Sequence, residues 1–272
     1  MNLKDQVAVV TGGGGGIGEG ICLCLAKGGA HVVVSDINME LAEAVSAKVK
    51  KIGRKAVAVK TDVRFEEQCQ ALIQRTIDEM GRLDILVCSA GTAAAHLMNA
   101  SEDGMNVENI PVEAWDLTMD VNLKGVFLCS RAAISHFKKQ KKGKIINISS
   151  DAGRRGGTLL PAYSASKAGV INLSQSLALQ LAPYNINVNS ICPGLIWTPL
   201  WEDGIKRMIE IRPEFKGTPP EDAFKSMVET QTPLRRAQTP EDMGNLVCFL
   251  ASDLAREITG QAINLDGGAQ LN

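Results

Sequence analysis

The chain alternates short, almost entirely apolar runs with longer stretches in which apolar residues recur every three or four positions. Short runs rich in Val and Ile are typical of buried strands, and a 3.6-residue period is typical of amphipathic helices. The runs predict strands at 6–11, 31–35, 56–60, 84–88, 144–149, 186–192 and 262–265. The periodic stretches predict helices at 17–28, 39–52, 65–80, 112–138, 161–182 and 240–251.

This regular alternation predicts an α/β fold, a single doubly wound Rossmann domain that spans residues 1–272. Its sheet is expected to have seven parallel strands with helices on both faces. In such folds ligands bind beyond the carboxyl ends of the strands. Polar residues that lie just past predicted strands are therefore expected to converge on one crevice: Asp36, Asp62, Ser89, Ser150 and Thr198.

A glycine-rich turn follows the first predicted strand. Gly12, Gly16 and Gly18 lie between an apolar strand and an amphipathic helix. Glycine lets the backbone turn sharply and approach a pyrophosphate, whose charge sits at the helix N-terminus. A loose linker would also be rich in glycine, but this position between strand and helix favours a dinucleotide site.

An aspartate ends the second predicted strand, and its position bears on the choice of cofactor. Asp36 could accept hydrogen bonds from both hydroxyls of an adenosine ribose, and it would repel a 2′-phosphate. No Lys or Arg lies in the glycine-rich turn or directly after Asp36 to receive such a phosphate. The sequence therefore predicts NAD rather than NADP. The alternative is that Asp36 only caps the following helix.

A tyrosine and a lysine are spaced for joint acid/base chemistry. Tyr163 and Lys167 stand four residues apart, so on a helix both side chains lie on one face. A free phenol titrates near ~10, and an ammonium one turn away would lower the pKa of Tyr163 toward the working range. The Ser150 hydroxyl could then hold a substrate oxygen beside the phenol. This trio predicts a device for oxidising an alcohol or reducing a carbonyl.

Together these residues resemble the short-chain dehydrogenase/reductase family, and the resemblance covers nearly the whole chain. It implies that Asn122, Ser150, Tyr163 and Lys167 are catalytic, with Asn122 keeping open a water chain from Lys167 to solvent. It also implies that Asp62 and Val63 hold the adenine ring and that the segment 193–199 holds the nicotinamide carboxamide. The implied cofactor contacts are Gly12, Gly16, Ile17, Gly18, Asp36, Ile37, Asp62, Val63, Ser89, Ala90, Gly91, Tyr163, Lys167, Pro193, Gly194, Ile196 and Thr198.

One motif departs from the family pattern. The family usually has Asn-Asn-Ala-Gly after its fourth strand, whereas here Cys88 and Ser89 precede Ala90 and Gly91. The two small residues that let backbone approach the cofactor are kept. The amides that brace the central sheet are lost, so we expect the site to persist with a changed supporting network.

Two segments interrupt the regular rhythm and are expected to define the substrate. The segment 92–111 is longer than the equivalent family loop and carries His96, Met98 and Met105, of which His96 is a candidate substrate contact. The family resemblance implies that the segment 198–238 is a helical lid that closes over substrate and excludes water. Trp197 and Trp201 are expected to contact substrate, with packing inside the lid or at a subunit contact as the alternative.

Two arginines follow the catalytic serine and offer a further substrate contact. A guanidinium at Arg154 or Arg155 could clamp a phosphate, sulfonate or carboxylate group of the substrate. A solvated loop or a salt bridge between subunits is the alternative reading of the same residues.

Composition and charge narrow the possible partners. The chain has 29 basic and 30 acidic residues, so no global field recruits nucleic acid or a membrane surface. No apolar run approaches the roughly eighteen residues of a membrane span, and no secretory leader opens the chain, so a cytoplasmic location is expected. Seven scattered cysteines and three separate histidines predict neither a disulfide framework nor a metal site.

The expected activity is reversible hydride transfer between NAD and a secondary alcohol, with a polyol, sugar alcohol or diol as substrate. A 3-oxoacyl thioester reductase, a hydroxysteroid-type dehydrogenase and a catalytically silent structural subunit remain as alternatives. Surplus apolar residues on the helices at 112–138 and 161–182 need a further partner. In the resembling family these helices pair across two-fold axes, so a homotetramer is expected, with a dimer as the alternative.

Overall fold

One parallel sheet runs through the whole protein. The computed structural model describes residues 1–98, 101, 104, 106–156, 160–211, 215 and 217–271. Its strands are ordered β3-β2-β1-β4-β5-β6-β7, and every pairing is parallel. Their bounds are β1 Val7–Thr11, β2 His31–Asp36, β3 Ala56–Lys60, β4 Ile85–Cys88, β5 Gly143–Ile148, β6 Ile186–Pro193 and β7 Ala262–Leu265. The predicted seven-stranded doubly wound fold is confirmed.

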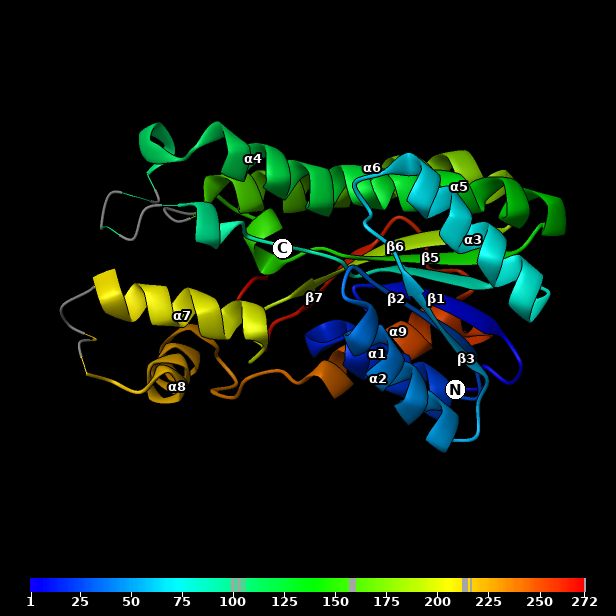
Figure 1. The fold of residues 1–272 in the computed structure, drawn as a ribbon, viewed down its shortest axis with the longest axis horizontal. Helices are drawn as coiled ribbons and strands as arrows, with labels where there is room; N and C mark the ends of the chain where they lie inside the picture. The colour runs from blue at the N-terminus through cyan, green and yellow to red at the C-terminus, as the bar shows by residue number, and fades with distance from the viewer. Residues whose placement is uncertain are drawn as a thin grey trace.

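Helices cover both faces of this sheet (Figure 1). One face carries α1 (Gly16–Lys27), α2 (Met39–Lys51) and α9 (Pro240–Ala251). The other carries α3 (Glu66–Met80), α4 (Val112–Met119), α5 (Gly125–Gln140) and α6 (Pro161–Leu181). Because both faces are covered, the strands read as continuous apolar runs rather than as alternating patterns.

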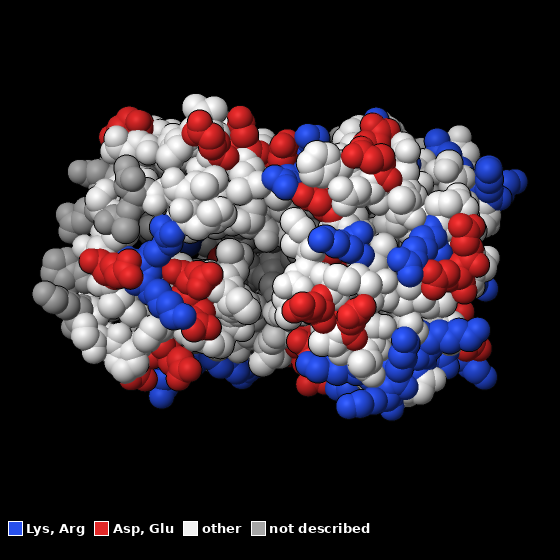
Figure 2. Space-filling model, viewed as in Figure 1, with Lys and Arg blue, Asp and Glu red and all other residues white. Residues whose placement is uncertain are grey.

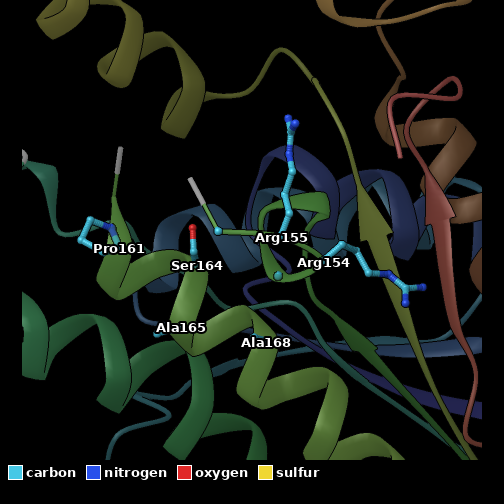
Figure 3. A pocket seen from close by; sticks show the side chains of 8 residues that line it. Arg154, Arg155, Pro161, Ser164, Ala165 and Ala168 are labelled. Carbon is cyan, nitrogen blue, oxygen red and sulfur yellow. The ribbon is translucent and has the colours of Figure 1, made fainter. Parts of the chain in front are cut away.

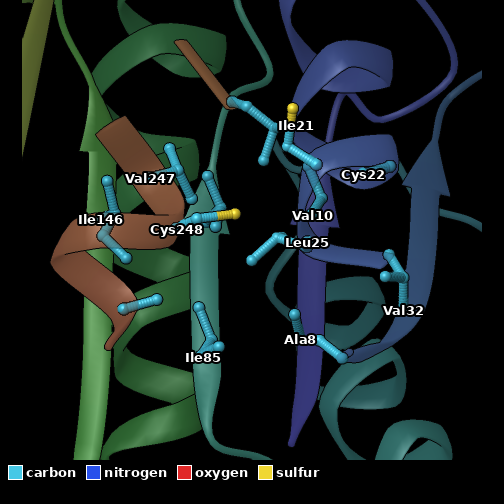
Figure 4. Packing of buried hydrophobic residues seen from close by; sticks show 14 of the residues in the cluster. Ala8, Val10, Ile21, Cys22, Leu25, Val32, Ile85, Ile146, Val247 and Cys248 are labelled. Carbon is cyan, nitrogen blue, oxygen red and sulfur yellow. The ribbon is translucent and has the colours of Figure 1, made fainter. Parts of the chain in front are cut away.

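The side chains of alternate strand residues pack into two separate cores, one on each face of the sheet. Ala8 and Val10 of β1 point toward α1, where they pack with Leu25 and with Val247 of α9 (Figure 4). Val9, between them, belongs to the cluster beneath α3, α5 and α6. This two-residue period is what a strand covered on both faces requires.

One predicted helix is broken in the structure. The periodicity at 112–138 predicts a continuous helix, but a π-helical turn, Asp120–Lys124, separates α4 from α5. A π-turn holds one extra residue, and such turns are frequent at functional sites. A single inserted residue hardly changes an apolar period, so the pattern could not show it.

Two helices stand beyond the carboxyl ends of the strands. They are α7 (Pro199–Ile211) and α8 (Pro220–Gln231), in the segment expected to form a lid. They share a small apolar cluster of their own, built around Leu195, Ile205 and Phe224. The molecular surface is hollowed between this part and the main body (Figure 2). Across the described residues, no helix is long and apolar enough to cross a membrane.

Candidate active site

The carboxyl ends of the central strands lie at one level and bring distant loops together. Thr11, at the end of β1, is level with Ser35 of β2 and Cys88 of β4. The Thr11 hydroxyl accepts hydrogen bonds from the backbone N–H groups of Ser89 and Ala90, at 3.2 and 3.4 Å. The Thr11 hydroxyl thus braces the loop after β4.

The glycine-rich turn is too tightly packed for a side chain at two of its glycines. Gly12 has φ +64°, and a Cβ there would lie 2.7 Å from the Cα atom of Ala90. A Cβ at Gly18 would overlap the carbonyl oxygen of Gly12. Gly15 caps α1 without a side-chain hydrogen bond, so the first N–H groups of this helix are left for an anion. The turn, with the half-buried Ile17, fits the pyrophosphate of a dinucleotide.

The Asp36 carboxylate faces this turn. Its Oδ2 accepts from the Gly14 N–H and its Oδ1 from the Asn38 N–H, both at 2.9 Å. The cap of α2 is Asn38, whose side chain accepts from two backbone N–H groups, so the cap alternative for Asp36 is wrong. Each carboxylate oxygen keeps a lone pair for a ribose hydroxyl. Ile37, next to it, is 58 % exposed, which suits one side of an adenine ring.

The residues expected at the adenine are already engaged with the protein. Asp62 forms a bidentate ion pair with Arg64, and this guanidinium holds the pKa of the carboxyl below its usual range. Val63 is buried and packs where a Cβ at Gly125 would stand. Val63 therefore fixes the start of α5 and requires a glycine there.

Asn122 lies inside the π-turn and is fully buried. Its amide donates to the Thr92 carbonyl and the Ser166 hydroxyl, at 2.9 and 3.0 Å, and its carbonyl accepts from the Thr92 N–H at 2.8 Å. The hydrogen bonds of the Asn122 side chain thus join the loop after β4 to α6. A Cβ at Gly91 would be 3.5 Å from both Asn122 Oδ1 and Lys167 Nζ. Asn122 Oδ1 and Lys167 Nζ therefore both lie next to Gly91.

Tyr163 and Lys167 lie one turn apart on α6, as the spacing predicts, with Lys167 Nζ 5.5 Å from the centre of the Tyr163 ring. Nζ also donates to the Ile148 carbonyl at 2.9 Å. Burial lowers the pKa of Lys167 to about 8 and raises the pKa of Tyr163 to about 12. The lowering of the Tyr163 pKa that was expected from Lys167 is therefore wrong, and burial of the phenol determines the direction of the shift.

Ser150 lies two residues after β5, directly before a short 3₁₀ turn, Asp151–Gly153. Its hydroxyl lowers the pKa of Tyr163, against the larger effect of burial. The same hydroxyl donates to Asp151 Oδ1 at 3.1 Å and accepts from the Ala152 N–H at 3.1 Å. Burial raises the pKa of the Asp151 carboxyl. The sequence analysis did not single out Asp151. The one feature of the sequence that could have indicated it is its position directly after Ser150.

The segment after β6 returns to the glycine-rich turn. Pro193 ends β6, and the Gly194 N–H donates to the Leu265 carbonyl at 3.1 Å. Ile196 is buried and bridges to Gln238. The methyl group of Thr198 would lie 3.3 Å from a Cβ at Gly16, so residues far apart in sequence enclose one space.

The four expected substrate residues have different surroundings. Trp197 and Trp201 pack edge-on against Phe224, with their ring centres 5.0 and 6.0 Å from its ring centre. This arrangement agrees with the alternative to substrate contact, packing inside the lid. His96 is exposed on a short turn, and no described contact joins it to the catalytic residues. Met105 and Gly157 lie outside the described residues.

Arg154 does not point toward a substrate. Its Nε donates to Asn264 Oδ1 at 2.9 Å and one of its two terminal nitrogens donates to the Ala262 carbonyl, so the guanidinium ties the loop to β7. Arg155 leaves the loop in another direction and is exposed (Figure 3). The pocket beside it, about 410 Å³, is lined on α6 by Pro161, Ser164, Ala165 and Ala168 rather than by Tyr163 or Lys167. This pocket is therefore not the catalytic crevice.

Comparison with known proteins identifies the family. A family model described as enoyl-(acyl carrier protein) reductase matches residues 12–270. A diacetyl reductase ((S)-acetoin forming) of Staphylococcus epidermidis is 36% identical over 97% of this chain and 98% of its own length. A 3-oxoacyl-(acyl-carrier-protein) reductase of Thermotoga maritima is 34% identical over 98% of this chain and 99% of its own. The crystal structure of an NAD⁺-bound xylitol dehydrogenase superposes with a TM-score of 0.88 at 29% identity, covering 98% of this chain and 100% of that one. The chain belongs to the short-chain dehydrogenase/reductase family of oxidoreductases.

Proposed function

We propose that the protein transfers a hydride between NAD and a secondary alcohol or its ketone, and that its substrates are polyols, sugar alcohols or diols. One observation carries the reaction class: Ser150, Tyr163 and Lys167 meet at the same strand ends as the glycine-rich turn. A structural neighbour named as a xylitol dehydrogenase and a relative named as a diacetyl reductase that forms (S)-acetoin support the substrate class.

Each part of the site has a defined task in this reaction. The turn at Gly12–Gly18 would hold the pyrophosphate, Asp36 the adenosine ribose, and the segment 193–198 the nicotinamide end. Bound NAD would supply the hydride acceptor. Tyr163 takes the hydroxyl proton at its phenol oxygen, and Ser150 holds the substrate oxygen. The lid helices exclude water from the crevice.

The choice of NAD rests on Asp36. Its carboxylate lies against the turn, held by two backbone N–H groups, and a 2′-phosphate there would meet a negative charge. This geometry speaks against the second candidate, a 3-oxoacyl thioester reductase using NADP. That candidate is favoured by the similarity to the Thermotoga maritima reductase.

A substrate panel separates the two candidates. Xylitol, 2,3-butanediol, a hydroxysteroid and a 3-hydroxyacyl thioester would each be offered with NAD and with NADP, and reduced nucleotide followed by absorbance. The proposal expects turnover of a polyol or diol with NAD and a higher kcat/KM than with NADP. Turnover of the thioester alone, with NADP, would replace it by the second candidate. Cofactor binding without any turnover would favour the silent subunit.

A further inference from the structure

Ser150 stands at the start of a short turn that other parts of the chain hold on two sides. It is the N-cap of the 3₁₀ turn Asp151–Gly153, and its hydroxyl accepts from the Ala152 N–H at 3.1 Å. A hydrogen bond of 2.9 Å from the Arg154 N–H to the Asp151 carbonyl closes the turn. The direction of the Ser150 hydroxyl therefore depends on how this turn is fixed to the rest of the protein.

One side of the turn lies against α6. A Cβ at Gly153 would be 2.7 Å from the carbonyl carbon of Lys167, so the two backbones are in direct contact. The hydroxyl of Ser149, the residue before Ser150, donates to the Lys167 carbonyl oxygen at 2.8 Å. These contacts fix the turn to the helix that carries Tyr163 and Lys167.

The Arg154 side chain fixes the turn on its other side. It leaves the loop after β5 and extends past β6 to β7 (Figure 3). There its Nε donates to Asn264 Oδ1 at 2.9 Å, and a terminal nitrogen donates to the Ala262 carbonyl. Neighbouring strands lie roughly 4.8 Å apart, so only a long side chain spans β6. A guanidinium also presents its donors in a rigid fork, so it binds two acceptors at once.

The partner of Arg154 on β7 is itself tied to the end of the chain. Asn264 Nδ2 donates to the Gln270 carbonyl at 3.0 Å. The buried Asp266 carboxylate accepts from the N–H groups of Gly268 and Gln270, at 2.9 and 2.8 Å, which folds the segment after β7 back onto the strand. A path of hydrogen bonds thus runs from this C-terminal segment through Asn264 to the guanidinium of Arg154.

We propose that Arg154 is a positioning residue, which holds the Ser150 hydroxyl at the substrate oxygen by fixing the serine's turn to β7 and the C-terminal segment. Arg154 contacts β7 rather than substrate, so its effect reaches the reaction only through Ser150. A displacement of about 1 Å in a catalytic group is enough to slow a reaction by ~10²-fold. The inference rests on the proposed function, in which Ser150 holds the substrate oxygen.

The first test removes the donors of Arg154 and keeps its stem. In Arg154→Met the turn loses its hold on β7, so kcat for the best alcohol of the substrate panel should fall about tenfold, with little change in the KM for NAD. Arg154→Lys keeps one donor group and should restore part of the loss. Arg155→Met removes the same charge from the next residue, which is exposed, and is the matched control. Unchanged kcat in Arg154→Met, or an equal loss in Arg155→Met, would overturn the proposal.

A double-variant cycle separates positioning from a general effect on the fold. Ser150→Ala removes the group that Arg154 positions, so adding Arg154→Met should cause no further loss of kcat. A residue that only stabilised the fold would lower kcat by the same factor in both backgrounds. Asn264→Ala removes one of the two acceptors and should cause part of the Arg154→Met loss, with nothing added when the two are combined. Losses that multiply in the Ser150→Ala background would contradict the assigned role.

The last arm needs no substrate, so it is independent of the proposed function. The N–H groups of Gly153 and Arg154 close the turn, and their exchange with deuterium is followed by mass spectrometry of the peptide 149–156. After correction for intrinsic rates, these amides should exchange about tenfold faster in Arg154→Met and at the wild-type rate in Arg155→Met. Wild-type exchange in Arg154→Met would show that the guanidinium does not fix the turn. If wild-type protein oxidises no alcohol, the proposed function fails, while this exchange still decides whether Arg154 holds the turn.

Discussion

Tyr163 and Lys167 are both shifted toward their neutral forms, and burial is the main cause for each. A buried phenol keeps its proton and a buried ammonium loses it more easily, because the low-dielectric interior disfavours charge of either sign. The i, i+4 spacing correctly placed the two side chains on one face of a helix. It could not give the direction of the pKa shift of Tyr163, because the burial of a side chain depends on the whole fold and not on the spacing within one helix.

The first prediction removes only the tyrosine hydroxyl. Tyr163→Phe keeps the ring and its packing, so NADH should still bind. Turnover should fall by ~10²-fold or more, because no group remains to take the substrate proton. Nucleotide binding is followed by fluorescence and turnover by NADH absorbance. Near-normal turnover in the purified variant would take Tyr163 out of the reaction.

The second prediction concerns Asp36. Asp36→Ala removes the acceptor for the ribose hydroxyls and the repulsion of a 2′-phosphate. The preference for NAD over NADP should narrow by about 1–2 kcal/mol, roughly tenfold in the ratio of kcat/KM values. Asp253→Ala, which removes an exposed carboxylate far along the chain, is the control and should leave the ratio unchanged. A wild-type protein that already prefers NADP would contradict the role given to Asp36.

Among the elements, strands were the most predictable. The bounds of all seven agree with the structure to within one residue at each end. Short runs of Val and Ile are typical of strands that are covered on both faces, so the pattern identifies them well. The break between α4 and α5 could not be predicted, since a π-turn adds one residue without changing which positions are apolar. The lid was expected as a region, but the bounds of α7 and α8 needed the structure.

The glycine-rich turn offers a matched pair of substitutions within one element. In Gly18→Ala the new Cβ meets the backbone of Gly12, which cannot move aside, so the free energy of unfolding should fall by about 1–3 kcal/mol. In Gly15→Ala the Cβ has no atom within 4 Å, so stability should change by no more than about 0.5 kcal/mol. Both are measured by urea unfolding. Equal effects of the two substitutions would show that the turn is not packed as described.

At the scale of the whole molecule, the sequence predicted which residues converge but not what they touch. Thr198 closing over Gly16, and Asn122 tied to Thr92 and Ser166, are contacts between segments that no local pattern connects. The same limit applies to Arg154, whose partners lie on β7, more than a hundred residues away.

The expected surplus of apolar residues on α5 and α6 is smaller than the sequence suggested. The protein's own core buries four of these residues, Val126, Val170, Leu177 and Leu181. Phe127 remains 41 % exposed, beside a groove of about 560 Å³ between α5 and α6 that Leu123 and Leu173 also line. β7, at the edge of the sheet, is only partly buried along its length. The homotetramer stays a prediction, and these two surfaces are the candidates for its contacts.

Assembly can be tested with one charge at that groove. Wild-type protein should elute as a tetramer by size-exclusion chromatography with light scattering. Phe127→Asp should shift it to smaller species, because a charge replaces an apolar contact at the two-fold axis. Ile52→Asp, an exposed apolar residue at the end of α2, is the control. A fully active wild-type monomer at micromolar concentration would rule the tetramer out.

The central claim, that this site moves a hydride from a carbinol carbon to NAD, is tested most directly with deuterium. Xylitol and 2,3-butanediol labelled at their carbinol carbons would be incubated with equal amounts of NAD and NADP, and the reduced nucleotides analysed by mass spectrometry. The account predicts deuterium in NADH, little in NADPH, and neither with Tyr163→Phe. Label in NADPH alone, or equal label from Tyr163→Phe and wild-type protein, would contradict it.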